Sequence, residues 1–296
     1  MFSVAEAFDL KNIGEGLNGL CSDGTSLYAV FASGEAVKIN PTSGDWVQRN
    51  LSKRYNVEQP VSLSAYGAYL YISDWQNHRI VKLTKSFGYV GSYGYYWQKN
   101  LAKTVRSLLI RRSIILSHRS NSFGGLPKTS RFKKLIYLIR KIISTDKLMI
   151  SKPNGCYFSD DKVFVVSKNN RCIILCDNNF HPISQVKGAS LDRLGSVCQV
   201  SSMPIFCDEQ NSRLFVILDC GTLSFFDAKL RPFAAVKLAD GKTISVGDDG
   251  IEVFNPEMDS IFTTTDETDL HGITVCNGEI FFAQRETGKI FKVAHV

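Results

Sequence analysis

The chain lacks several features that identify common protein classes. No run of about eighteen uninterrupted apolar residues occurs, so we expect no membrane-spanning helix. None of the eight cysteines forms a Cys-x-x-Cys pair, so a zinc ribbon is not indicated. The phosphate-binding loop, the HExxH zinc motif, the GxGxxG dinucleotide fingerprint and the serine nucleophile elbow are also absent. The enzyme classes that carry those motifs are therefore not indicated.

Acidic residues are missing from one long segment. Between Tyr96 and Thr145 there are twelve Lys or Arg and no Asp or Glu. The formal net charge of the whole chain is +7, so the remainder carries −5 (7 minus 12). A basic segment on a mildly acidic body predicts a local surface for an anionic partner, with phospholipid and nucleic acid as the usual candidates.

The N-terminus gives no secretory signal. Residues 1–10 contain Glu6 and Asp9 and no long apolar stretch. Most cysteines lie in apolar, strand-like runs, where a free thiol behaves as a small buried hydrophobe. We therefore expect a reducing, cytoplasmic location, peripheral to the inner face of a membrane if the basic segment binds lipid.

A repeated layout of short strands predicts the fold. Aromatic residues make up 11% of the chain, and such residues suit half-buried strands. Four strands recur within about 40 residues, as in a blade of an antiparallel propeller. We count six copies, which begin near residues 19, 60, 153, 203, 243 and 272. The copy near residue 203 is expected to use strands 214–218, 222–226 and 233–236.

The last copy lacks an outer strand, and residues 2–8 are free to supply it. The prediction is thus an all-β, six-bladed β-propeller formed by residues 1–94 and 149–296, with an insertion at residues 95–148.

The insertion is predicted to be a basic α-helical hairpin. Phe132, Leu135, Ile136, Ile139 and Ile143 form an apolar stripe at helical spacing, and a less regular stripe precedes the Gly/Pro-rich breaker at residues 122–127. The stripe is expected to lie on a membrane surface with its cations toward anionic headgroups. Packing on the propeller or a protein, or nucleic-acid binding, are the alternatives. The residues expected to bind the membrane or another anionic partner are Trp97, Lys99, Lys103, Arg106, Arg111, Arg112, Lys128, Arg131, Lys133, Lys134, Arg140 and Lys141.

One turn carries a family resemblance. The run from Ser73 to Ile80 includes Asp74, Asn77, His78 and Arg79, and it resembles the core of the NHL repeat. Residues 169–171 repeat it more weakly. The resemblance implies that these polar residues support the turn between two strands and take no part in chemistry. It also implies a protein-interaction module, and some NHL propellers bind RNA.

A weaker resemblance concerns a metal. Glu15, Asn154 and His271 match metal-ligating positions of the gluconolactonase and senescence-marker family of six-bladed propellers, with a histidine where that family has an aspartate. The resemblance implies one divalent cation at the mouth of the central channel. His118, His181 and His295 form no paired ligand motif, so we expect surface or turn positions for them.

The favoured function is a non-enzymatic NHL-type propeller that binds a protein partner, needs no cofactor and is attached peripherally to a membrane. The alternative is a divalent-metal-dependent lactonase- or esterase-like hydrolase, and the second alternative is an RNA-binding propeller.

Overall fold

The computed structural model describes residues 3–94, 150–159, 161–187, 191, 194–197, 204–218 and 222–295. The predicted helical insertion, with all twelve of its candidate binding residues, lies outside these ranges. Within them, no helix is long and apolar enough to cross a membrane.

Six four-stranded antiparallel sheets make up the described protein, as predicted. Blade 1 contains β2 (Leu17–Ser22), β3 (Leu27–Phe31), β4 (Glu35–Ile39) and β5 (Trp46–Asn50). Blade 2 contains β6 (Pro60–Tyr66), β7 (Tyr69–Asp74), β8 (Arg79–Thr84) and β9 (Tyr89–Gly94). Blade 3 contains β10 (Pro153–Phe158), β11 (Val163–Ser167), β12 (Cys172–Cys176) and β13 (Pro182–Lys187). Blade 4 contains β14 (Leu194–Val197), β15 (Ile205–Asp208), β16 (Arg213–Ile217) and β17 (Leu223–Asp227). Blade 5 contains β18 (Ala234–Lys237), β19 (Thr243–Gly247), β20 (Gly250–Phe254) and β21 (Ser260–Thr264). Blade 6 contains β22 (Leu270–Cys276), β23 (Glu279–Gln284), β24 (Lys289–His295) and β1 (Ser3–Asp9).

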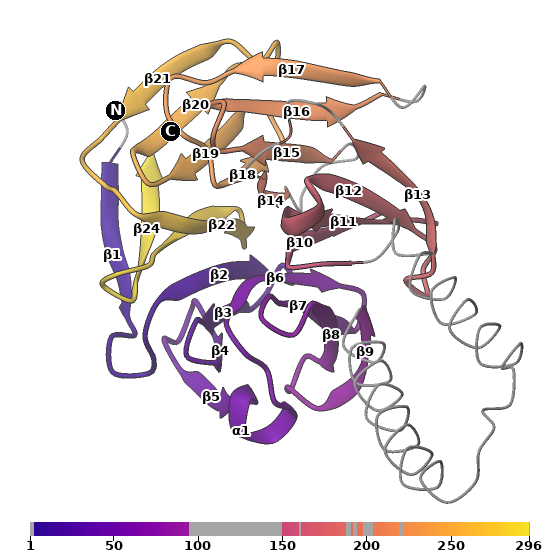
Figure 1. The fold of residues 1–296 in the computed structure, drawn as a ribbon. Helices are drawn as coiled ribbons and strands as arrows, with labels where there is room; N and C mark the ends of the chain where they lie inside the picture. The colour runs from indigo at the N-terminus through magenta and orange to yellow at the C-terminus, as the bar shows by residue number, and fades with distance from the viewer. Residues whose placement is uncertain are drawn as a thin grey trace, which may run out of the picture.

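The blades form a ring, and the first strand of each faces the middle (Figure 1). The N-terminal strand β1 pairs antiparallel with β24 and is the outer strand of blade 6, which confirms the predicted closure by both termini. This arrangement protects β24, which would otherwise present an open edge.

The strand assignment of blades 4 and 5 corrects the prediction. Blade 4 begins at β14, before the expected start near residue 203, and Ala234–Lys237 opens blade 5 where an outer strand of blade 4 was expected. In this part of the chain the predicted blade boundaries were therefore wrong by one strand. The cause is β14, which has only four residues and lacks the proline that opens blades 2 and 3.

The hydrophobic core lies between blades. The described residues form six apolar clusters, one for each pair of neighbouring blades, including the pair formed by blades 6 and 1. Alternate side chains of each strand point to opposite faces of its sheet, so both faces of every blade are covered. All six described cysteines are free and buried in these layers, as expected: Cys21, Cys156, Cys172, Cys176, Cys207 and Cys276. Burial raises the pKa of Cys156 to about 12.

Helix is scarce in the described ranges. They hold α1 (Leu51–Tyr55), which leads from blade 1 to blade 2, and the 3-10 turn η2 (Lys168–Asn170) in blade 3. Asn50 caps α1 by accepting a hydrogen bond from the Lys53 backbone N–H at 2.7 Å.

Candidate functional site at the channel mouth

One position of each blade gathers at one end of the central channel. It is the residue directly after the second strand, and together these six line a cavity of about 290 Å³. We call this cavity the channel mouth. The six ring residues are Ala32, Trp75, Lys168, Glu209, Asp248 and Arg285.

Backbone hydrogen bonds fix the ring residues. The N–H of Lys168 donates to the carbonyl of Lys152 at 3.2 Å, and that of Arg285 donates to the carbonyl of Asp269 at 2.9 Å. Lys152 and Asp269 each precede a first strand and hold a left-handed backbone, with φ of 48° and 57°. The same backbone hydrogen bond thus positions ring residues in different blades.

The bulged residue of the first strand adds a second tier to the channel mouth. Asn18 and Asn154 both line it. Their amide Nδ2 atoms donate to the carbonyls of Pro60 and Leu194 in the next blade, at 2.9 and 2.7 Å. These side chains are therefore engaged in joining neighbouring blades.

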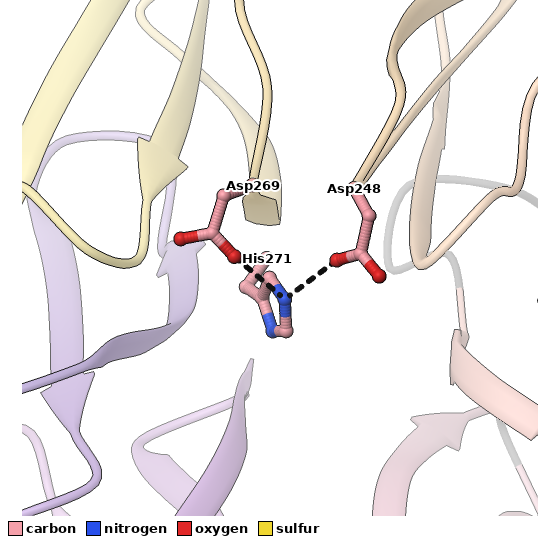
Figure 2. Close-up of side chains that lie close together, drawn as sticks. All are labelled: Asp248, Asp269 and His271. Atoms are coloured by element: carbon pink, nitrogen blue, oxygen red, sulfur yellow. Dashed lines mark hydrogen bonds and ion pairs between the residues drawn. The ribbon is translucent and has the colours of Figure 1, made fainter.

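His271 is the corresponding residue of β22, and two carboxylates converge on it (Figure 2). Its Nε2 lies 3.2 Å from Oδ1 of Asp248 in blade 5 and 3.5 Å from Oδ1 of Asp269. The Phe233 ring packs against the imidazole with a centroid separation of 4.1 Å. The side chain of His271 is only 10% exposed, whereas that of Asp248 is 44% exposed.

Burial governs the charge state of this cluster. It lowers the pKa of His271 to about 4, helped by the nearby Arg285 guanidinium and opposed by Asp248. Burial also raises the pKa of Asp269, although the Glu286 N–H donates to its Oδ2 at 2.8 Å. At neutral pH the imidazole is therefore uncharged and lies between two acidic side chains.

The rest of the channel mouth is mixed in charge. Lys168 lies 3.5 Å from the buried carboxylate of Glu209. The Lys152 ammonium sits 3.7 Å from the centroid of the Trp75 ring. The described residues of the channel mouth thus offer an aromatic face and charges of both signs, and they are not uniformly basic.

The channel narrows sharply beyond His271. This residue also lines a second cavity of about 20 Å³, enclosed by the first strands. Such a volume holds about one water molecule. Gly272 allows this close packing, because a Cβ there would lie 2.8 Å from the Leu20 backbone nitrogen. Among the described residues, the wider of the two cavities that His271 lines is therefore the channel mouth.

The residues suggested by the metal resemblance are only partly brought together. Asn154 and His271 both line the channel mouth, but the exposed Glu15 does not. Glu15 is instead tied through its backbone to Ser33, whose Oγ accepts its N–H at 3.0 Å. The structure places Asp248 and Asp269 beside His271.

The NHL-like residues form a turn in which Asp74 and Arg79 are buried. Asp74 accepts hydrogen bonds from the Glu58 N–H at 2.9 Å, from the Asn77 amide and from Nε of Arg79 at 2.7 Å. His78 links blades 2 and 3, since its Nδ1 accepts the Lys152 N–H at 3.2 Å. These contacts support the turn between strands.

Blade 4 repeats this turn. Asp208 accepts hydrogen bonds from Asn211 at 2.9 Å and from Arg213 at 3.1 Å, with the same residue spacing as in blade 2. The motif was legible in the sequence but was missed because the repeat was displaced there. The weaker match at residues 169–171 has Ser167 in place of the aspartate, and its Oγ accepts the Ser151 N–H at 3.1 Å.

Two of the histidines expected at surface or turn positions lie beyond the side chains that the structure describes. His181 is exposed and pairs with Asp177 at 3.0 Å. His118 and the side chain of His295 lie outside the described residues.

Comparison with known proteins finds the fold alone. No protein-family model matches the sequence, and no curated protein matches it. A streptogramin B lyase structure is similar with a TM-score of 0.62 and 13% identity, covering 99% of this chain and 97% of that one. The RRP9 WD40 repeats are similar with a TM-score of 0.61 and 7% identity, covering 99% of this chain and 99% of that one. The WD40 propeller domain of Doa1 is similar with a TM-score of 0.59 and 10% identity, covering 98% of this chain and 96% of that one. The shared property is the propeller fold. The NHL family is not specifically indicated.

Proposed function

We propose that this protein is a non-enzymatic binding module that holds a protein partner over its channel mouth and attaches to an anionic membrane surface through its basic segment. The observation that carries the first part is the ring itself. Six loops from six blades present unlike side chains around one cavity.

The chemistry of the channel mouth suits a polypeptide partner. Binding residues concentrate on loops that a rigid scaffold positions, and the ring residues are of this kind. Trp75 and Arg285 belong to the residue types that dominate protein-binding energies. A cavity of about 290 Å³ admits a few side chains of a partner and not a folded domain. We therefore infer that an extended segment or loop of the partner docks there.

Paired substitutions test the location of this site. The double variant Trp75→Ala with Arg285→Ala removes two ring side chains. Its matched control is Trp46→Ala with Arg49→Ala, a similar exposed pair on the outer strand β5. Proteins crosslinked to the full chain in cells should be lost with the first variant and retained with the second.

Retention of the same crosslinked proteins by the Trp75 and Arg285 variant would contradict docking at the channel mouth, provided that circular dichroism shows it folded. If the crosslinked proteins were lost only with the Trp46 and Arg49 variant, the partner would instead bind at the rim.

The membrane part rests on the composition of residues 96–145, with twelve cations and no acid. Cations near an anionic leaflet each contribute about 1 kcal/mol before screening by salt. Full-length protein should co-sediment with anionic vesicles and not with neutral ones, and a deletion of residues 96–147 should abolish this. Equal sedimentation of the full-length chain and the deletion variant with anionic vesicles would contradict the membrane proposal.

Binding of RNA would show itself differently in the same preparation. An affinity for RNA that falls steeply with added salt, and that disappears with the deletion, would assign the basic segment to nucleic acid.

A further inference from the structure

The arrangement around His271 supplies more acceptors than one ring nitrogen can satisfy. Oδ1 atoms of both Asp248 and Asp269 lie within 3.5 Å of Nε2. One imidazole nitrogen carries either one proton or one lone pair, so it makes one good hydrogen bond at most. The second carboxylate is therefore left without a matched donor from this nitrogen.

A cation among the three atoms resolves this conflict. We propose that Asp248, Asp269 and His271 bind one divalent first-row transition metal ion, with zinc as the representative, across the interface of blades 5 and 6. This site goes beyond the binding function proposed above and does not depend on any protein partner.

The distances fit such a site. Zinc bonds to nitrogen and oxygen of about 2.0–2.2 Å separate the donors of a tetrahedral centre by roughly 3.3–3.5 Å. The two Nε2–Oδ1 separations are 3.2 and 3.5 Å, and all three donor atoms lie within 4.8 Å of one another. A small rotation of the exposed Asp248 carboxylate would bring all three donor atoms to these separations.

Surrounding contacts hold two of the ligands in place. Phe233 packs on the imidazole, and the Glu286 N–H occupies Oδ2 of Asp269, which leaves Oδ1 toward His271. Such outer contacts orient metal ligands in characterised sites. The backbone N–H of Asp269 also donates to the carbonyl of Asp248 at 3.2 Å, which ties the two carboxylate loops together.

The donor set indicates the class of metal and leaves an open position. One imidazole with two carboxylates suits zinc, manganese or cobalt, whereas calcium and magnesium prefer oxygen alone. Three protein ligands leave room for a water or ligand atom at the channel mouth. The charges of Asp248, Asp269 and the neighbouring Arg285 sum to −1, so a divalent ion would leave a net positive site that favours an anionic ligand group.

Zinc titration of the full-length protein tests the proposal. Chelator-treated protein is titrated with zinc against a chromophoric zinc indicator, and cobalt is added in parallel for its absorption spectrum. The ligand variants are Asp248→Asn, Asp269→Asn and His271→Asn. Asp249→Asn is one control, since Asp249 pairs with Arg231 at 2.6 Å, and His181→Asn tests a histidine that faces a single carboxylate.

We expect one equivalent of zinc in the wild type and a loss of affinity of at least roughly 10–100-fold in each ligand variant, on the scale set by perturbed metal sites. Both controls should bind as the wild type does, and bound cobalt should show no thiolate charge-transfer band.

Folded wild-type protein that takes up no zinc would overturn the proposal. So would unchanged affinity in Asp248→Asn, the variant least able to disturb folding because its side chain is 44% exposed. A thiolate band from bound cobalt would assign the metal to cysteines and also overturn it.

Discussion

His271 Nε2, on the first strand of blade 6, lies 3.2 Å from Oδ1 of Asp248, which follows the second strand of blade 5. The contact joins two blades at the channel mouth and brings together side chains separated by 23 positions in the sequence. It also distinguishes two kinds of polar residue in this propeller. Those of the NHL-like turn are hydrogen-bonded to one another and to backbone groups, whereas Asp248 and His271 line a cavity that a ligand can enter.

The NHL-like turn should matter for stability. In Arg79→Ala the fully buried Asp74 loses its ion-pair partner, and breaking a buried pair in this way costs about 3–5 kcal/mol. Arg231→Ala breaks an exposed pair with Asp249 and should cost less than about 1 kcal/mol. Urea unfolding followed by tryptophan fluorescence measures both. A similar loss in the two variants would mean that the turn does not stabilise the blade as argued.

The sequence was sufficient for the fold because strands and turns repeat. The alternation of apolar residues and the proline at the start of blades 2 and 3 placed most blades, and the N-terminal strand was correctly assigned to blade 6. The candidate site was harder to predict. The repeat pattern did not single out the position after the second strand in any blade, so neither Asp248 nor the other ring residues were predicted to line a cavity.

His271 was singled out by the resemblance to the gluconolactonase and senescence-marker family, but its two carboxylate neighbours were not. Asp269 is the residue with a left-handed backbone directly before β22, and Asp248 contacts His271 from another blade. A contact between blades depends on how the ring closes, which the pattern of one blade does not contain.

Close packing of the first strands gives a second stability prediction. In Gly272→Ala the new Cβ would lie 2.8 Å from the Leu20 nitrogen, and overpacking of this kind costs about 1–3 kcal/mol. Gly91→Ala on the outer strand β9 meets open space and should change stability by no more than about 0.5 kcal/mol. Thermal unfolding compares the two, and an unperturbed Gly272→Ala would show that the channel can widen.

Acid sensitivity should depend on Asp23. Burial opposes its ionisation, but the Lys85 ammonium at 2.9 Å and the N–H groups of Ser26 and Thr25 outweigh burial and hold the pKa of Asp23 well below its usual range. The folded state then binds fewer protons than the unfolded chain, so this stabilisation is present above a pH of about 4 and is lost as the pH falls further.

The free energy of unfolding measured against pH tests this linkage. Asp23→Asn should be less stable than the wild type at neutral pH and should flatten the decline below a pH of about 4. Asp161→Asn, an exposed aspartate with only a 4.0 Å contact to Lys162, is the control. Parallel acid profiles for the wild type and Asp23→Asn would refute the role of Asp23.

Removal of residues 1–9 should open the ring. The outer strand β1 pairs with β24, and Lys289 forms an ion pair with Glu6 at 2.7 Å. Without β1, the backbone of β24 becomes an exposed edge that favours association. Light scattering should show concentration-dependent oligomers of the truncated chain, whereas the intact chain should not associate through this edge. A monomeric truncated chain of unchanged stability would contradict the closure argument.

Site-specific photocrosslinking tests the proposed binding site most directly. A benzophenone amino acid replaces Trp75 at the channel mouth or, in a separate chain, the rim residue Trp46, which is 49% exposed. Both chains are irradiated in cells and compared on the same gel. Docking over the channel mouth predicts a discrete protein adduct from position 75 that is absent from position 46. Adducts from position 46 alone, or the same adducts from both positions, would contradict it.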